Sequence, residues 1–185
     1  MNPIAIALFS LFAASGAIAA EIGGVRLDDK ISIEGKELVL NGAGIRTRAI
    51  FKVYVASLYV PAKATDLAGV LAAGPRRVQM NLLRTLSAEQ LVDALNDGLK
   101  DNNTEAELGA VKSQIDQLAS ILKTFREVKE KDVVALDYVE GGTRVGLNGD
   151  AKGIIPGEAF NRALMKIWLG DHPVQSDLKK AMLGG

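Results

Sequence analysis

The sequence contains no cysteine and only one histidine, His172. Because no disulfide can form, the fold must be held together by its hydrophobic core. A lone histidine without cysteine argues against a structural zinc site. No dinucleotide-binding glycine motif, P-loop or nucleophile elbow is present. The sequence therefore predicts no metal and no cofactor, and we interpret His172, beside a proline, as a solvated turn residue.

Neither sign of charge is in excess. Lys and Arg together number 22, as do Asp and Glu, which gives a formal net charge of zero. Charges of the two signs alternate along the chain, so no basic stripe indicates nucleic acid and no polybasic run indicates an anionic membrane surface. We expect neither as a partner, and the sequence does not identify a protein partner.

Charged side chains are absent from residues 1–20. An apolar run over residues 4–14 leads to small residues, among which Ala17-Ile18-Ala19 matches the A-x-A pattern of a signal-peptidase site. We predict a signal peptide over residues 1–20, cut after Ala19 or Ala20, and a periplasmic or secreted protein. A membrane anchor is the alternative, but its apolar part is shorter than the ~20 residues that span a bilayer. We expect no stable membrane insertion after cleavage.

Residues 21–185 are long enough for one domain with a single core. Strand patterns come first, two helices follow, then a three-strand meander and further helices. This segregation predicts an α+β fold with a largely antiparallel sheet. The expected strands lie at 25–27, 31–33, 36–40, 45–60, 77–83, 133–139, 143–147 and 151–155.

Helix starts are marked by paired polar residues. Ser87 with Gln90, and Thr104 with Glu107, are two capping boxes. Behind the second, apolar residues from 108 to 125 recur at spacings of three and four, which predicts one amphipathic helix. A further helix is expected after Pro156, with an apolar face of Phe160, Leu164, Ile167 and Trp168.

Four segments carry a family resemblance. GAGIR at residues 42–46 and FKVYVASLYV at 51–60 form a glycine-x-glycine-x-arginine turn followed by a tyrosine-bearing strand. NGDAKGIIPG at 148–157 and IWLGDHPVQSDLKKAML at 167–183 form a hairpin entering a helix and a closing segment. With these motifs the chain resembles the chalcone-isomerase fold family, in particular its bacterial, exported branch, which is related to fatty-acid-binding members. The resemblance implies an open-faced β-sandwich, a large antiparallel sheet packed against a helical layer around an apolar cleft.

The resemblance also implies where an enzyme of this family would have its catalytic side chains. The family's arginine falls at Arg46, and its strand threonine at Tyr54. The family's remaining catalytic positions fall at or near Leu91, Gly98, Ile167 and Trp168. Three of these residues have no side-chain donor, and losing one positioned donor commonly lowers a rate by ~10²–10³. We therefore assign no catalytic residue.

Fatty-acid-binding relatives hold a carboxylate with an arginine and a tyrosine, and Arg46 and Tyr54 match these roles. A guanidinium binds a carboxylate bidentately, and a phenol adds a neutral donor. We therefore predict a non-catalytic binder of a fatty acid or similar apolar carboxylate, with Arg48 as a substitute cation and Trp168 lining the pocket. Eight residues of straight strand span ~26 Å, so Arg46 and Tyr54 meet only if the chain bends near residues 44–50.

Two other functions stay open at this point. One is an intramolecular lyase of chalcone-isomerase type that acts on an unidentified enone or phenol. The other is an interaction module whose groove is filled by side chains, which requires that no cavity exists beside Arg46. The binder instead requires an apolar cavity of at least ~300 Å³ with a guanidinium at its inner end.

Overall fold

The computed structural model describes residues 20–185. The predicted signal peptide lies outside these residues, except for Ala20, which begins strand β1 (Ala20–Ile22). This strand pairs with β2 (Val25–Leu27) in a small hairpin that contacts β4 of the main sheet.

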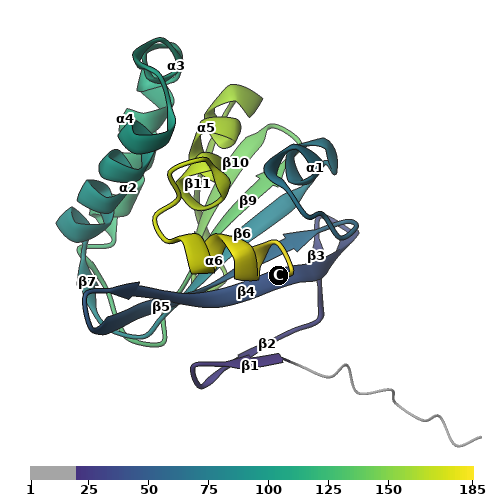
Figure 1. Cartoon of the computed structure of the whole chain (residues 1–185). Coiled ribbons are helices and arrows are strands. Elements are labelled where there is room, and N and C mark those ends of the chain that lie inside the picture. The colour runs from purple at the N-terminus through teal and green to yellow at the C-terminus, as the bar shows by residue number, and fades with distance from the viewer. Residues whose placement is uncertain (1–19) are drawn as a thin grey trace, which may run out of the picture.

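A seven-stranded sheet, in the order β11-β10-β9-β6-β5-β4-β3, is the centre of the fold (Figure 1). Every pairing in it is antiparallel, as expected for strands joined mainly by hairpins. Its strands are β3 (Lys30–Ile33), β4 (Lys36–Arg48), β5 (Phe51–Val60), β6 (Arg76–Leu82), β9 (Val133–Val139), β10 (Gly142–Leu147) and β11 (Asp150–Ile155). A separate two-stranded ribbon pairs β7 (Leu86–Ser87) with β8 (Glu127–Val128).

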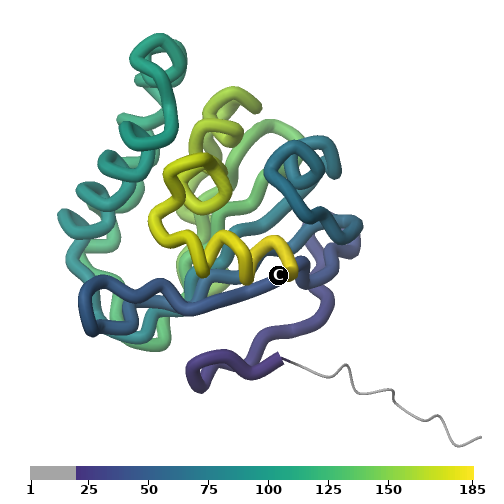
Figure 2. The backbone as a smooth tube through the Cα atoms, viewed as in Figure 1, coloured from purple at the N-terminus to yellow at the C-terminus, as the bar shows by residue number. Residues whose placement is uncertain are grey.

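The helices gather over one face of the sheet, as Figures 1 and 2 show. This is the α+β fold that the strand and helix order predicts, arranged as the open-faced sandwich that the family resemblance implies. The helices are α1 (Leu67–Ala72), α2 (Ala88–Asn102), α3 (Glu105–Ala110), α4 (Lys112–Thr124), α5 (Glu158–Leu169) and α6 (Ser176–Met182).

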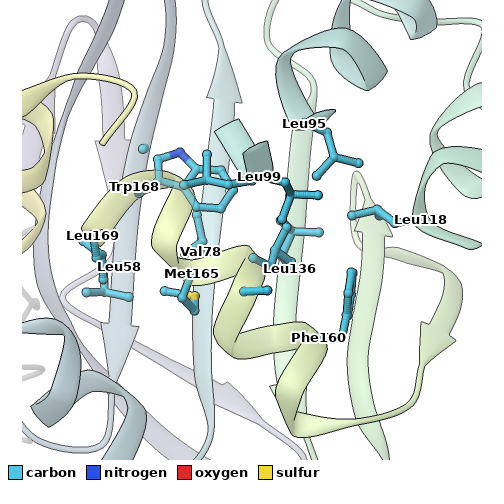
Figure 3. Close-up of a cluster of buried hydrophobic side chains, with 14 of the residues drawn as sticks. Leu58, Val78, Leu95, Leu99, Leu118, Leu136, Phe160, Met165, Trp168 and Leu169 are labelled. Carbon is cyan, nitrogen blue, oxygen red and sulfur yellow. The ribbon is translucent and has the colours of Figure 1, made fainter. Parts of the chain in front are cut away.

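Helix α5 supplies much of the core between the two layers. Figure 3 shows its Phe160, Met165 and Trp168 packed with Leu58 of β5 and Leu136 of β9. Each of these side chains is buried. Full burial of one such side chain stabilises a fold by about 1.5–3 kcal/mol, so this layer fixes α5 and the residues it carries.

The predicted single strand over residues 45–60 is wrong. The structure has a hairpin there, in which β4 ends at Arg48 and β5 begins at Phe51. Ala49 turns the chain with a positive φ of 53°. Non-glycine residues adopt this conformation uncommonly, so an alanine is no turn signal in a sequence.

The predicted glycine turn at residues 42–44 is also absent, because both glycines lie within β4. They allow helix α6 to approach the strand closely. A Cβ atom at Gly42 would lie 2.0 Å from the carbonyl oxygen of Ala181, and one at Gly44 would lie 2.9 Å from the Ala181 Cβ.

Both predicted capping boxes are confirmed, at Ser87 and Thr104. The single amphipathic helix expected behind Thr104 is instead divided into α3 and α4. Val111, with φ −119° and ψ 19°, interrupts it. Gly109 weakens α3 just before this point, since glycine is a poor helix former.

Candidate functional site

A cavity of about 370 Å³ lies between the sheet and helices α2, α4 and α5. Most of its lining is apolar, and Leu118, Leu136 and Leu164 are buried within it. Arg48, Gln90, Asp97 and Asp101 also line it but are exposed. The cavity therefore has an apolar interior and a polar mouth, which is the usual design of a small-molecule site.

The β4–β5 hairpin carries the polar groups on the sheet side of the cavity. Its register places Arg46 directly opposite Tyr54. The register then shifts between Arg46 and Thr47, which pairs with Lys52, so Val53 is an extra residue on β5. Such a bulge re-aims side chains, and both Val53 and Tyr54 line the cavity.

This hairpin resolves how two residues eight positions apart can share a site. They face each other across two strands, instead of lying far apart along one strand. Directly opposed residues in an antiparallel pair have Cβ atoms about 5 Å apart. Arg46 and Tyr54 can therefore contact the same ligand group.

Tyr54 accepts a hydrogen bond from the indole nitrogen of Trp168, at 3.1 Å. Burial raises the pKa of Tyr54, and the hydrogen bond from Trp168 and the nearby charge of Arg46 oppose this only in part. The phenol is therefore neutral at ordinary pH. Because its oxygen is the acceptor for Trp168, its own proton is available to a second acceptor, such as a carboxylate oxygen.

Arg46 is half-buried and has no acidic partner among residues 20–185. Its Nη1 atom donates to the Thr47 carbonyl oxygen and, at 3.4 Å, to Oε1 of Gln175. The same Gln175 oxygen accepts from the Thr47 amide at 2.8 Å, and its Nε2 donates to the Ile45 carbonyl at 3.1 Å. Neutral groups thus position this cation and leave its charge without an internal counterion.

All four residues predicted for the ligand site, Arg46, Arg48, Tyr54 and Trp168, line the cavity. Two arginines stand there, where a single guanidinium was expected, and Arg48 is the more exposed. Trp168 is also part of the core, so packing and lining are compatible roles. Whether these side chains bind a ligand stays a prediction.

Gln175 is the site residue that sequence reasoning missed. It precedes α6 and contacts residues about 130 positions earlier in the chain. No local pattern signals such a contact. His172 lies exposed in its turn, and no cluster of metal-ligating side chains occurs within the described part of the chain. No helix within residues 20–185 combines the length and the apolar character needed to cross a bilayer.

Comparison with known sequences assigns the family. A model of the chalcone isomerase-like family matches residues 19–184. The chain belongs to the chalcone isomerase-like family. No curated protein sequence matches it.

Solved structures agree with this family on the fold. A crystal structure of an Arabidopsis thaliana fatty-acid binding protein superimposes with a TM-score of 0.69, over 86% of this chain and 92% of that one. The two sequences are 13% identical, so this likeness establishes the fold alone.

The positions to which the family resemblance assigns the catalytic set all line one cavity. Three of them have no polar side-chain atom, and a Cβ atom at Gly98 would lie 2.8 Å from Cγ2 of Ile167. A donor could therefore return at Gly98 only if Ile167 moved. The positions that line the cavity are Arg46, Tyr54, Leu91, Gly98, Ile167 and Trp168.

Proposed function

We propose that this protein binds a fatty acid or a similar apolar carboxylate, without catalysis, in the cavity between the sheet and the helices. The apolar chain occupies the leucine-lined interior, and Arg46 binds the carboxylate. Tyr54 donates a second hydrogen bond to the same group. Arg48 is the second cation available at the mouth.

The observation that carries this proposal is Arg46 itself. It is a half-buried guanidinium that faces a phenol at an apolar cavity and has no acid partner among the described residues. A cation removed from water without a counterion is costly, so an anionic ligand at this point would be stabilised. The fatty-acid-binding protein of the same fold supports the choice of ligand class.

Titration calorimetry with oleate tests the proposal. Arg46→Ala should weaken oleate binding about 10- to 100-fold, because a hydrogen bond to a charged group contributes about 1.5–3 kcal/mol. The matched control is Arg162→Ala, which removes an exposed arginine on α5 outside the cavity. Equal oleate affinity of the unchanged protein, Arg46→Ala and Arg162→Ala would refute the role of Arg46. Arg48→Ala then tests the substitute cation.

The second candidate is an intramolecular lyase for an enone or phenol. It is favoured by the opposed pair of donors, Arg46 and Tyr54, which could stabilise an oxyanion. The apolar Leu91, Gly98 and Ile167 count against it. Turnover of phenolic chalcones above their spontaneous rate, lost in Arg46→Ala, would establish the lyase. Inactivity across the panel together with oleate binding would establish the binder.

We also propose that the chain is an exported member of the family, with residues 1–20 as its signal peptide. The family match begins at residue 19 and β1 begins at Ala20. A cut after Ala19 therefore leaves every described strand intact, and a cut after Ala20 removes only the first residue of β1. The mass of the protein from the periplasm of an expressing bacterium should correspond to a chain that starts at Ala20 or Glu21. Uncleaved protein confined to the cytosol would contradict export.

A further inference from the structure

The tip of the β4–β5 hairpin exposes two large apolar side chains. Ile50 is 85% exposed and Phe51 is 55% exposed. The positive φ of Ala49 makes the turn that carries Ile50 at the end of the hairpin. Figure 2 shows this hairpin projecting at the left edge of the molecule, below helices α2 and α4.

Three cations surround this apolar tip. Arg48 pairs with Phe51 across the hairpin, and Lys52 follows Phe51 in the chain. The guanidinium of Arg84, from the segment after β6, lies over the Phe51 ring at 4.9 Å from its centroid. Within residues 20–185, none of the three is in an ion pair.

The same hairpin forms one wall of the cavity. Arg46, Arg48, Val53 and Tyr54 line it, immediately before and after the tip. An object that binds the tip therefore lies beside the cavity mouth.

We propose that this tip, Arg48 to Lys52 with Arg84, is a docking surface for an anionic lipid membrane. Ile50 and Phe51 enter the interfacial layer of the bilayer, while the three cations contact anionic headgroups. Apolar side chains ringed by Lys and Arg are the chemistry of peripheral membrane attachment. A soluble protein partner would need a surface that is both apolar and acidic at this one place, whereas an anionic membrane presents both over its whole area.

This placement gives the cavity a route to lipid. Arg48 belongs both to the tip and to the cavity lining, so docking of the tip would bring the cavity next to the layer in which fatty acids partition. Only this route for the ligand rests on the proposed function, because membrane docking of the tip does not depend on what the cavity binds.

Co-sedimentation with vesicles tests the docking. The whole processed chain should bind vesicles of equal parts phosphatidylglycerol and phosphatidylcholine, and bind phosphatidylcholine alone far more weakly. Binding should fall as salt rises, because ions screen the exposed charges. Ile50→Ser should lower the partition at least tenfold, and Lys52→Glu should lower it on anionic vesicles only.

Ile154→Ser is the matched control. Ile154 is a large apolar residue of β11 that is 52% exposed and does not line the cavity. Its replacement should leave vesicle binding unchanged. The proposal is overturned if the unchanged protein does not bind anionic vesicles, or if Ile50→Ser and Ile154→Ser behave alike.

A fluorescence measurement reports the depth of the tip. Phe51→Trp adds a reporter to the buried Trp168, and its emission should shift to the blue on anionic vesicles, while the unchanged protein shows no such shift. Light scattering of the protein without vesicles tests whether the tip binds a second copy of the chain instead. If the unchanged protein is a dimer and Ile50→Ser is a monomer, the tip is a dimer interface, and membrane docking is overturned.

Separate measurements test membrane docking and oleate binding. Ile50→Ser should bind oleate in vesicle-free solution as the unchanged protein does, because Ile50 does not line the cavity. Loss of vesicle binding with intact oleate binding supports the docking tip. Intact vesicle binding without any oleate binding would instead refute only the ligand.

Discussion

Arginines stand on both faces of the sheet, in different surroundings. On the outer face, Arg77 donates to both carboxylate oxygens of Asp137, at 2.5 and 2.8 Å, and Arg144 bridges Asp137 and Glu34. On the face that meets the helices, Arg46 contacts only an amide and a carbonyl oxygen. The outer face thus pairs its arginines with carboxylates. The helix-side face holds the buried Arg76 with the Asn161 side chain and two carbonyl oxygens, and it leaves Arg46 beside an apolar cavity.

The difference separates cations that hold the fold from a cation that is available to a ligand. Asp137 is 4% exposed, and such a carboxylate is stable only with its partners in place. Arg46 receives positioning contacts but no neutralising charge. We therefore expect changes on the outer face to alter stability, and changes at Arg46 and Tyr54 to alter ligand binding.

Asp137→Ala should produce the largest effect. It leaves Arg77 and Arg144 without their shared carboxylate, and removal of one partner from a buried ion pair costs about 3–5 kcal/mol. Urea unfolding measures this loss, with Asp137→Asn as the control that keeps the shape and one acceptor. Oleate affinity of the folded fraction should not change, and an equal loss of affinity would erase the distinction between the two faces.

Tyr54→Phe should lower oleate affinity about tenfold, since it removes one hydrogen bond to the carboxylate. The raised pKa of Tyr54 keeps the phenol protonated, so the affinity of the unchanged protein should be constant from about pH 7 to about pH 9. Calorimetry over this range checks both statements. If the affinity fell within that range, the phenol would be ionising and could not be the donor.

Arg46→Ala should change the free energy of unfolding by less than about 1 kcal/mol, because no internal ion pair is lost. The measurement is a urea transition in the absence of ligand, compared with Asp137→Ala. A destabilisation as large as that of Asp137→Ala would mean that Arg46 holds the fold.

The smallest effect concerns Glu107, which lies away from both arginine groups. Its hydrogen bond to Lys166, and then that to the Thr104 amide, lower its pKa from 4.5 to about 2. A lowered folded-state pKa stabilises the fold above the unfolded value of 4.5, and this stability is lost as pH falls towards about 2. Glu107→Gln should flatten stability slightly over that acid range, as thermal unfolding at several pH values would reveal.

Local patterns predicted most of the fold. The capping boxes at Ser87 and Thr104 gave the helix starts, and the asparagine-glycine turn at 148–149 gave the last hairpin. The turn of the β4–β5 hairpin was not predicted because it uses Ala49 and Ile50, without glycine, asparagine or proline. The sequence pattern between Arg46 and Tyr54 is therefore that of one strand.

The family resemblance predicted Arg46 and Tyr54. Arg48 was the substitute cation on the same strand pattern, and Trp168 lay on the apolar face of the expected helix. The cavity holds all four together. Gln175 could not be found, because it meets Arg46 and Thr47 only through tertiary contacts. The absence of a basic run led to the expectation of no anionic membrane surface, yet the fold gathers Arg48, Lys52 and Arg84 around one tip.

A crystal structure of the oleate complex tests the central claim most directly. The account predicts one carboxylate oxygen within about 3 Å of the Arg46 guanidinium, a hydrogen bond from Tyr54, and the hydrocarbon chain among the buried leucines. An oleate whose carboxylate lies away from Arg46, or a cavity that stays empty at saturating oleate, would contradict it.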